Sequence, residues 1–254
     1  MIVGIDKFRQ HFAGHDGQYA LIGGAACHLL FNEAGLPFRA TKDLDMVLSV
    51  EVVSAEFATV FARFLESGGY QAREKSDGDR EFFRFHKPTD KDYPFMIELF
   101  SRRIKGLELP DHAQVTRLKV EDEILSLSAI LLEDDYYAAV QNSKKMINGI
   151  SILDESLLIP FKARAFLDLT QRRFSGGNVK SGDIKKHRND VFRLLQLIPR
   201  DSQIVVPAPV MADLAHFVES VERDASLIPK LFGVDFTRTE GLQFLKKAYG
   251  LASK

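Results

Sequence analysis

The stretch from Tyr19 to Leu48 constrains the fold more than any other part of the chain. It begins with a short apolar, β-prone run, continues through two glycines, and then enters the run AACHLLFNEAG, which predicts a helix ended by Gly35 and Pro37. The apolar run Leu44–Val50 predicts a second strand. A strand, a helix and a strand in so short a segment indicate a fold of the α/β (α+β) class.

Two aspartates stand at the start of that second strand. Residues i and i+2 of a strand point to the same face, so Asp43 and Asp45 are expected to aim at one point in space. Two such carboxylates repel each other unless a cation or a shared proton lies between them. A divalent metal that carries a phosphate is the natural occupant. The alternative is a strand-entry turn in which both side chains act as caps.

The Asp-x-Asp spacing occurs twice more, at Asp77/Asp79 and at Asp90/Asp92. Both of these pairs lie among Ser, Gly, Lys and Pro with no apolar strand after them, so we expect solvated turns. The first pair differs because Asp45 leads directly into an apolar run. A charge at the start of a buried strand costs free energy unless it has a role.

Glu98 is the third candidate carboxylate, because it interrupts the run Phe95–Phe100, which predicts a strand. If that strand lies beside the one with the aspartates, Glu98 can reach the same cation. Three carboxylates can hold two Mg²⁺ ions, which orient a nucleoside triphosphate and neutralise charge at the attacking and leaving oxygens. The alternative is an edge strand whose Glu98 side chain faces water.

Gly23 and Gly24 fit the same interpretation. A turn without side chains lets backbone N–H groups approach a phosphate at the start of the following helix, although a bare Gly-Gly pair is more often only a tight turn. The chain lacks the P-loop and the G-x-G-x-x-G patterns. It also lacks Cys/His metal spacing, H-E-x-x-H and G-x-S-x-G, so zinc and serine-hydrolase chemistry have no support.

Composition sets outer limits on function. A chain of 254 residues suffices for one large or two modest domains. The formal net charge of -1 excludes a bulk electrostatic footprint for nucleic acid, although a local basic patch is compatible with it. Cys27 is the only cysteine, so no intrachain disulfide can form. We expect no secretory signal and no membrane span, and hence a cytoplasmic protein.

The character of the chain changes near Asp154. An α/β domain is expected over residues 1–152 and a helical domain over residues 153–254. In the first, Ser54–Ser67 has helical spacing, and Ile124–Leu132 is left open between strand and helix because periodicity alone does not decide it. In the second, helices are predicted from residue 155 onwards and near 183–198, 210–224 and 240–251.

Taken in order, LIGGAACHLL, RATKDLDMVL and FMIELF resemble the nucleotidyltransferase superfamily of the DNA polymerase β type. More narrowly, Arg39-x-Thr41-x-Asp43-Leu44-Asp45 is similar to the motif of the AbiEii/AbiGii-type nucleotidyltransferases. Two helical segments, LLIPFKARAFLDL and DIKKHRNDVFRLL, resemble later motifs of that family. Gly24 departs from the pattern, since many superfamily members have serine there.

The resemblance implies a mixed-sheet nucleotidyltransferase domain that carries the carboxylates and a helical domain that closes the cleft. It implies transfer of a nucleoside monophosphate from an NTP to an acceptor hydroxyl, with two Mg²⁺ ions on Asp43, Asp45 and Glu98. Several relatives are toxins of bacterial toxin–antitoxin or phage-defence pairs, and some modify tRNA ends. The implied partners are therefore an NTP, an RNA, tRNA or protein acceptor, and an antitoxin protein.

The resemblance also implies roles for further residues. Those implied to bind the nucleotide are Gly23, Gly24, Arg39 and Thr41. Lys162 is implied to neutralise the triphosphate, although a lysine in an apolar helix face commonly extends to solvent. Lys186 is implied to contact phosphate, with Asp190 as an orienter or proton acceptor near the acceptor hydroxyl. The alternative is that Lys186 and Asp190, at i and i+4, form a surface pair.

Basic residues bracket the Gly-rich loop at 175–182. They are Arg172, Arg173, Lys180, Lys185, Lys186 and Arg188. Such a cluster guides an RNA acceptor through salt-sensitive contacts, or it is a solvated helix face. For the chain as a whole, the rival hypothesis is a binding protein that keeps the fold and a nucleotide or partner surface but has no turnover.

Overall fold

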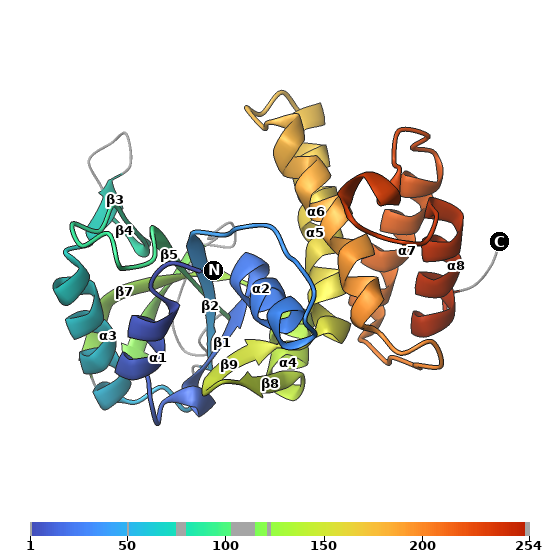
Figure 1. The fold of residues 1–254 in the computed structure, drawn as a ribbon. Coiled ribbons are helices and arrows are strands. Elements are labelled where there is room, and N and C mark those ends of the chain that lie inside the picture. The colour runs from blue at the N-terminus through green and yellow to red at the C-terminus, as the bar shows by residue number, and fades with distance from the viewer. Residues whose placement is uncertain (1, 50, 75–79, 103–114, 121–122, 252–254) are drawn as a thin grey trace. The chain divides into compact units, whose positions relative to one another are not determined.

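The computed structural model describes residues 2–49, 51–74, 80–102, 115–120 and 123–251 (Figure 1). Contacts between residues divide the chain into two compact units, Met1–Leu153 and Asp154–Lys254. The Asp77/Asp79 pair lies outside the described residues. None of the described helices combines the length and the apolar character needed to cross a bilayer.

The first unit is built on a mixed sheet. Within the described residues it has nine strands, in the order β3-β4-β5-β2-β1-β9-β8, with β7 pairing to both β5 and β6. The strands are β1 Tyr19–Ile22, β2 Asp43–Leu48, β3 Gln71–Glu74, β4 Arg80–His86, β5 Met96–Ser101, β6 Val115–Val120, β7 Glu123–Leu131, β8 Lys144–Ile147 and β9 Ile150–Leu153. The predicted α/β (α+β) class is confirmed, and the run that the sequence left open is strand β7.

Helices accompany this sheet. They are α1 Ile5–His11, α2 Gly23–Glu33, α3 Ala55–Gly68 and α4 Asp134–Asn142, with the short 3₁₀ helix η1 Asp16–Gln18. The prediction for α3 is confirmed almost to the residue, because its ends are set locally. The Ser54 side chain accepts a hydrogen bond from the Phe57 N–H at the start, and Gly69 adopts φ +62° at the end.

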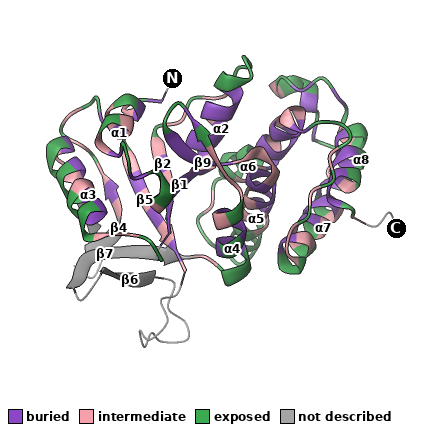
Figure 2. Ribbon diagram, turned by 90° about the horizontal axis from the view of Figure 1, so that it is seen from below, coloured by how far each residue is buried: buried purple, intermediate pink, exposed green. Residues whose placement is uncertain are grey.

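An aromatic core fills the space between the sheet and two of the helices. α1 and α3 lie side by side over one face of the sheet (Figure 1). The Phe61 ring of α3 lies 5.7 Å from the Phe85 ring of β4, and the Phe8 ring of α1 lies 5.4 Å from the Tyr19 ring of β1. β1 and β9 are buried along their whole length (Figure 2). The sheet is therefore anchored at its centre by apolar burial.

The second unit is helical. It contains α5 Glu155–Phe174, α6 Ser181–Leu194, α7 Ala208–Glu222 and α8 Arg238–Tyr249, with 3₁₀ helices η2 Leu195–Leu197 and η3 Pro229–Phe232. The predicted helices are confirmed with small shifts at their ends. α5 begins where Asp154 accepts a hydrogen bond from the Leu157 N–H. Pro160 has no N–H for the Ser156 carbonyl, which instead accepts a hydrogen bond from the Tyr249 hydroxyl at 2.5 Å.

Candidate active site

The side chains of Asp43, Asp45 and Glu98 emerge on one face of the sheet, hereafter the carboxylate face. β2 and β5 run parallel, and Asp45 pairs with Glu98 while Asp43 pairs with Met96. Paired residues on neighbouring strands point to the same face. The expectation that these two strands are neighbours is confirmed. Asp43 is the first residue of β2 and Asp45 the third, so both belong to the strand and the predicted alternative of a strand-entry turn is wrong. β5 lies between β4 and β2, so the alternative of an edge strand is also wrong.

The carboxylate face keeps partial access to water, whereas the opposite face is core. Residues along β5 alternate between partly exposed and buried, and the Glu98 side chain is 14% exposed. Leu44 and Ile97, on the opposite face, are fully buried. Because side chains alternate along a strand, the carboxylates lie on the partly exposed face of the sheet and the apolar side chains lie on the buried face. By contrast, Asp90 and Asp92 lie in a turn, where Asp90 accepts a hydrogen bond from the Asp92 N–H, as expected.

The first glycine allows a carboxylate to lie against the backbone where α2 begins. Gly23 has φ +66°, and a Cβ added there would overlap the Oδ2 atom of Asp45. Ile22, the residue before it, pairs with Asp45 across β1 and β2. The predicted Gly-Gly turn ahead of the helix is wrong, because α2 starts at Gly23 itself. The chain passes directly from strand to helix here, and only a residue without a side chain fits.

The loop between α2 and β2 brings the other predicted nucleotide-binding residues to the same place. A Cβ added at Gly24 would lie 2.7 Å from Thr41 Oγ1 and 3.7 Å from an Arg39 guanidinium nitrogen. His28, one turn along α2, lies at the same loop. Burial lowers the pKa of His28 below its ordinary value of 6.5, although a backbone hydrogen bond at Arg39 opposes this. The structure thus gathers Gly23, Gly24, Arg39, Thr41 and Asp45 at one helix start.

Glu98 is held by a cation that sequence reasoning missed. Arg84 pairs with Glu98 across β4 and β5, and its Nε and Nη2 atoms both contact Glu98 Oε1. The Arg84 side chain is 26% exposed. A signal for it exists in the sequence, because Arg84 interrupts the aromatic run Phe82–Phe85 just as Glu98 interrupts its own apolar run. Applying the same criterion to both strands would have found this residue.

The chemistry of the carboxylate face suits Mg²⁺, which prefers oxygen ligands. Among the described residues, no group of three or more His, Cys, Asp or Glu side chains is arranged to hold a metal ion. The Glu98 carboxylate contacts Arg84, while Asp43 and Asp45 lie two residues apart on the same face of β2. The two aspartates are therefore the side chains of this face that fit a cation.

Lys162 and Asp190 come together in the second unit as a buried ion pair. Lys162 Nζ lies 3.3 Å from Asp190 Oδ2, and the two side chains are 4% and 0% exposed. Arg193 Nη1 donates a hydrogen bond to the other oxygen, Asp190 Oδ1, at 3.1 Å. The prediction that Lys162 extends to solvent is wrong, because its helix face packs against α6. The surface pair of Lys186 and Asp190 is also wrong, since Asp190 is buried and Lys186 is exposed.

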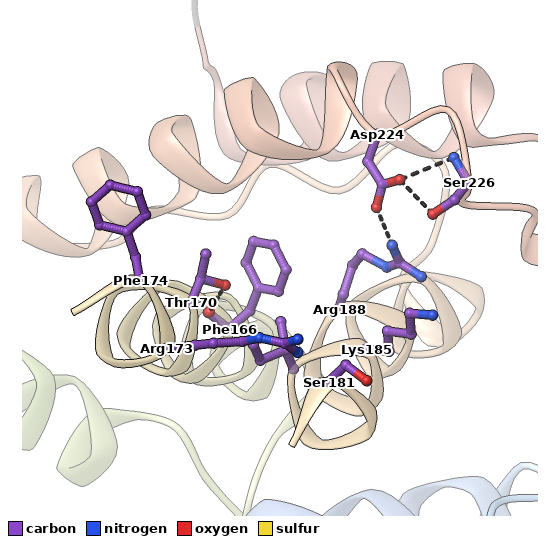
Figure 3. Close-up of a pocket in the computed structure, with 10 residues that line it drawn as sticks. Phe166, Thr170, Arg173, Phe174, Ser181, Lys185, Arg188, Asp224 and Ser226 are labelled. Carbon is purple, nitrogen blue, oxygen red and sulfur yellow. Dashed lines mark hydrogen bonds and ion pairs between the residues drawn. The ribbon is translucent and has the colours of Figure 1, made fainter. Parts of the chain in front are cut away.

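Part of the basic cluster lines a pocket of about 500 Å³ in the second unit. Phe166 contributes an apolar surface, and Arg173 and Lys185 supply positive charge (Figure 3). Arg188 is different, because it is buried and its guanidinium forms an ion pair with Asp224 (Figure 3). The cluster is thus neither wholly solvated nor wholly free to bind a ligand.

Asp224 lines this pocket and forms the ion pair with Arg188. Burial raises the pKa of Asp224, but hydrogen bonds from Ser226 and the positive charge of Arg188 lower it by more, so it lies below its ordinary value of 3.8. Phe174, at the end of α5, also lines the pocket and is 88% exposed. An exposed ring beside basic groups is a surface on which a base can stack.

No protein-family model matches the chain, and no curated protein matches it in sequence. Among solved structures it is similar to the antibiotic-resistance factor ANT(2'')-Ia, with 14% identity, a TM-score of 0.40, and 86% of this chain and 91% of that chain covered. It is also similar to a CCA-adding enzyme in complex with ATP, with 13% identity, a TM-score of 0.25, and coverages of 98% and 67%. Both TM-scores are below 0.5.

Proposed function

We propose that this protein is a Mg²⁺-dependent nucleotidyltransferase that moves a nucleoside monophosphate from an NTP to an acceptor hydroxyl. The observation that carries the proposal is the register of β2 and β5. That register sets Asp45 beside Glu98 on a partly exposed face, with Gly23 against the Asp45 carboxylate. The resemblance of the surrounding motifs to nucleotidyltransferases supports the same conclusion.

Each residue of the carboxylate face has a role in this proposal. Asp43 and Asp45 would hold Mg²⁺, which supplies positive charge at the attacking and leaving oxygens. The backbone at Gly23 and Gly24 would approach the triphosphate at the start of α2, where the helix dipole favours an anion. Arg39 and Thr41 lie beside Gly24 and would donate hydrogen bonds to the same nucleotide.

The reaction is an in-line displacement. The acceptor oxygen forms a bond to the α-phosphorus as the bond to the β-phosphate oxygen breaks, and pyrophosphate leaves. Glu98 would receive the proton of the acceptor hydroxyl on Oε2, because both contacts with Arg84 are made by Oε1.

The second unit contributes to this proposal in two ways. Lys162 and Asp190 would position α5 against α6, whereas the exposed Lys186 would contact phosphate. The pocket lined by Arg173 and Lys185 would receive an RNA acceptor, whose negative phosphates match the positive charge of these side chains. The motif resemblance further supports a cytoplasmic toxin of a toxin–antitoxin or phage-defence pair, with an antitoxin protein as partner.

The test is incubation of the protein with each α-labelled NTP, Mg²⁺, total bacterial RNA and total bacterial protein. Asp43→Asn and Asp45→Asn should abolish label transfer, because each removes a metal ligand, and neither should alter the far-UV circular dichroism spectrum. Asp92→Asn is the matched control, since it neutralises an exposed carboxylate of the same unit and should leave transfer unchanged.

Label transferred by the parent and the Asp92 variant alone would identify both the nucleotide and the acceptor class. Near-full activity of the Asp45→Asn variant would refute the assignment. Absence of transfer, together with thermal stabilisation by Mg²⁺ and an NTP, would favour the rival hypothesis of a nucleotide-binding protein without turnover.

A further inference from the structure

Arg84 places a positive charge against the carboxylate face through its ion pair with Glu98. It reaches Glu98 from the neighbouring antiparallel strand, and the two atoms Nε and Nη2 contact the same carboxylate oxygen. The two side chains are 26% and 14% exposed, so water screens this ion pair less than a pair on the open surface. The interaction is therefore strong enough to decide where the Glu98 carboxylate points.

Arg84 contacts Glu98 from the strand on the side away from the aspartates, because β4 and β2 lie on opposite sides of β5. Asp45 and Glu98 are paired residues on adjacent strands, which places their backbones about 5 Å apart. Yet no three acidic side chains of the described residues are grouped to hold a cation. The backbone thus provides a three-carboxylate arrangement that the side chains do not form while the guanidinium holds Glu98.

We propose that Arg84 is a positioning residue that holds Glu98 back from a metal ion bound by Asp43 and Asp45, and so weakens metal binding. The inference rests on the proposed metal site. A divalent cation and a guanidinium compete for one carboxylate, and their like charges repel across a distance of only a few ångströms. Removing the guanidinium releases Glu98 as a ligand and removes that repulsion.

The test is a Mn²⁺ titration of the full-length protein in which free Mn²⁺ is measured by electron paramagnetic resonance, a readout independent of turnover. Arg84→Gln should bind Mn²⁺ at least about fivefold more tightly than the parent. Arg84→Lys keeps the charge and should stay close to the parent. Arg102→Gln is the matched control, because Arg102 is 28% exposed and pairs with Glu51 in the same unit, and it should not change the affinity.

Each outcome either supports or overturns the proposed role of Arg84. Tighter binding in Arg84→Gln alone supports the inference. Unchanged affinity in Arg84→Gln, with parent binding that Asp45→Asn abolishes, overturns it and leaves the metal site standing. Equal tightening in Arg102→Gln shows a general effect of net charge and also overturns it. Absence of saturable Mn²⁺ binding in the parent overturns both this inference and the proposed metal site. Far-UV circular dichroism of each variant confirms that the fold is retained.

Discussion

Removal of the Asp190 carboxylate is expected to be among the most destabilising single changes in the second unit. Asp190 is fully buried and receives hydrogen bonds or ion pairs from Lys162 at 3.3 Å and Arg193 at 3.1 Å. Asp190→Leu leaves the Lys162 ammonium buried without its carboxylate. Breaking a buried ion pair from one side costs about 3–5 kcal/mol of unfolding free energy.

The partner substitution is expected to cost less. Lys162→Met leaves Asp190 with the Arg193 guanidinium, so the loss is that of one charged hydrogen bond, about 2 kcal/mol. In the double variant Lys162→Met/Asp190→Leu, the Arg193 guanidinium loses Asp190 as a partner, but its 17% exposed side chain can turn to water. Because apolar replacements of a buried pair are often nearly neutral, the double variant should cost about 1–2 kcal/mol, well below the sum of the single changes.

The assay is equilibrium urea unfolding followed by far-UV circular dichroism, since the chain has no tryptophan. Amide hydrogen exchange would locate the loss of stability to α5 and α6. The matched control is the exposed pair of Lys246 and Glu222, at 2.7 Å in the same unit, where Lys246→Met should cost less than about 1 kcal/mol. Additive effects of the two single changes, within about 0.5 kcal/mol, would refute the claim that Lys162 and Asp190 stabilise each other.

Three further results are expected. Gly23→Ala should destabilise the first unit by about 2 kcal/mol more than Gly14→Ala, because both have positive φ but only the first added Cβ meets a neighbour, Asp45. Equal unfolding free energies would contradict the close packing of the Asp45 carboxylate against Gly23. The pKa of Asp224 is lowered in the folded protein, so the stabilising effect of this carboxylate is present above its ordinary pKa of 3.8 and is lost as pH falls through the lower folded-state value. Asp224→Asn should therefore flatten the dependence of the urea midpoint on pH below about pH 4. An unchanged pH profile in this variant would contradict a stabilising role of the ionised Asp224. Lys185→Gln should weaken RNA binding and reduce the slope of log affinity against log salt by about one unit if the pocket contacts phosphate; an unaltered slope in filter binding would exclude that contact.

Local chemistry in the sequence determined much of the secondary structure. The serine before α3 and the glycine after it specify both helix ends, because caps act on backbone groups of the same few residues. The strand period of two places Asp43 and Asp45 on one face whatever the neighbouring strands are. An apolar run such as β7 gave no such answer, since its choice between helix and strand depended on pairing with β5 and β6.

In the candidate site, too, some features follow from the local sequence and others only from contacts between distant segments. Asp43, Asp45 and Glu98 stand out in the sequence because each interrupts or begins an apolar strand, where an unused charge is costly. The same criterion picks out Arg84 as a charge in an aromatic run, but its pairing with Glu98 arises only from the antiparallel register of β4 and β5. Likewise, Lys162 acquires a buried carboxylate only when α5 packs against α6.

The sequence by itself determined which residues carry charge into apolar elements, where most helices end, and which side chains of a strand share a face. Those properties depend on neighbours within one or two turns of the chain. Only the tertiary structure decided that Asp45 lies beside Glu98, that Arg84 holds that glutamate, and that Lys162 is paired with Asp190. Strand order, register and helix packing arise from contacts between distant segments, which the local periods of 3.6 and 2 do not encode.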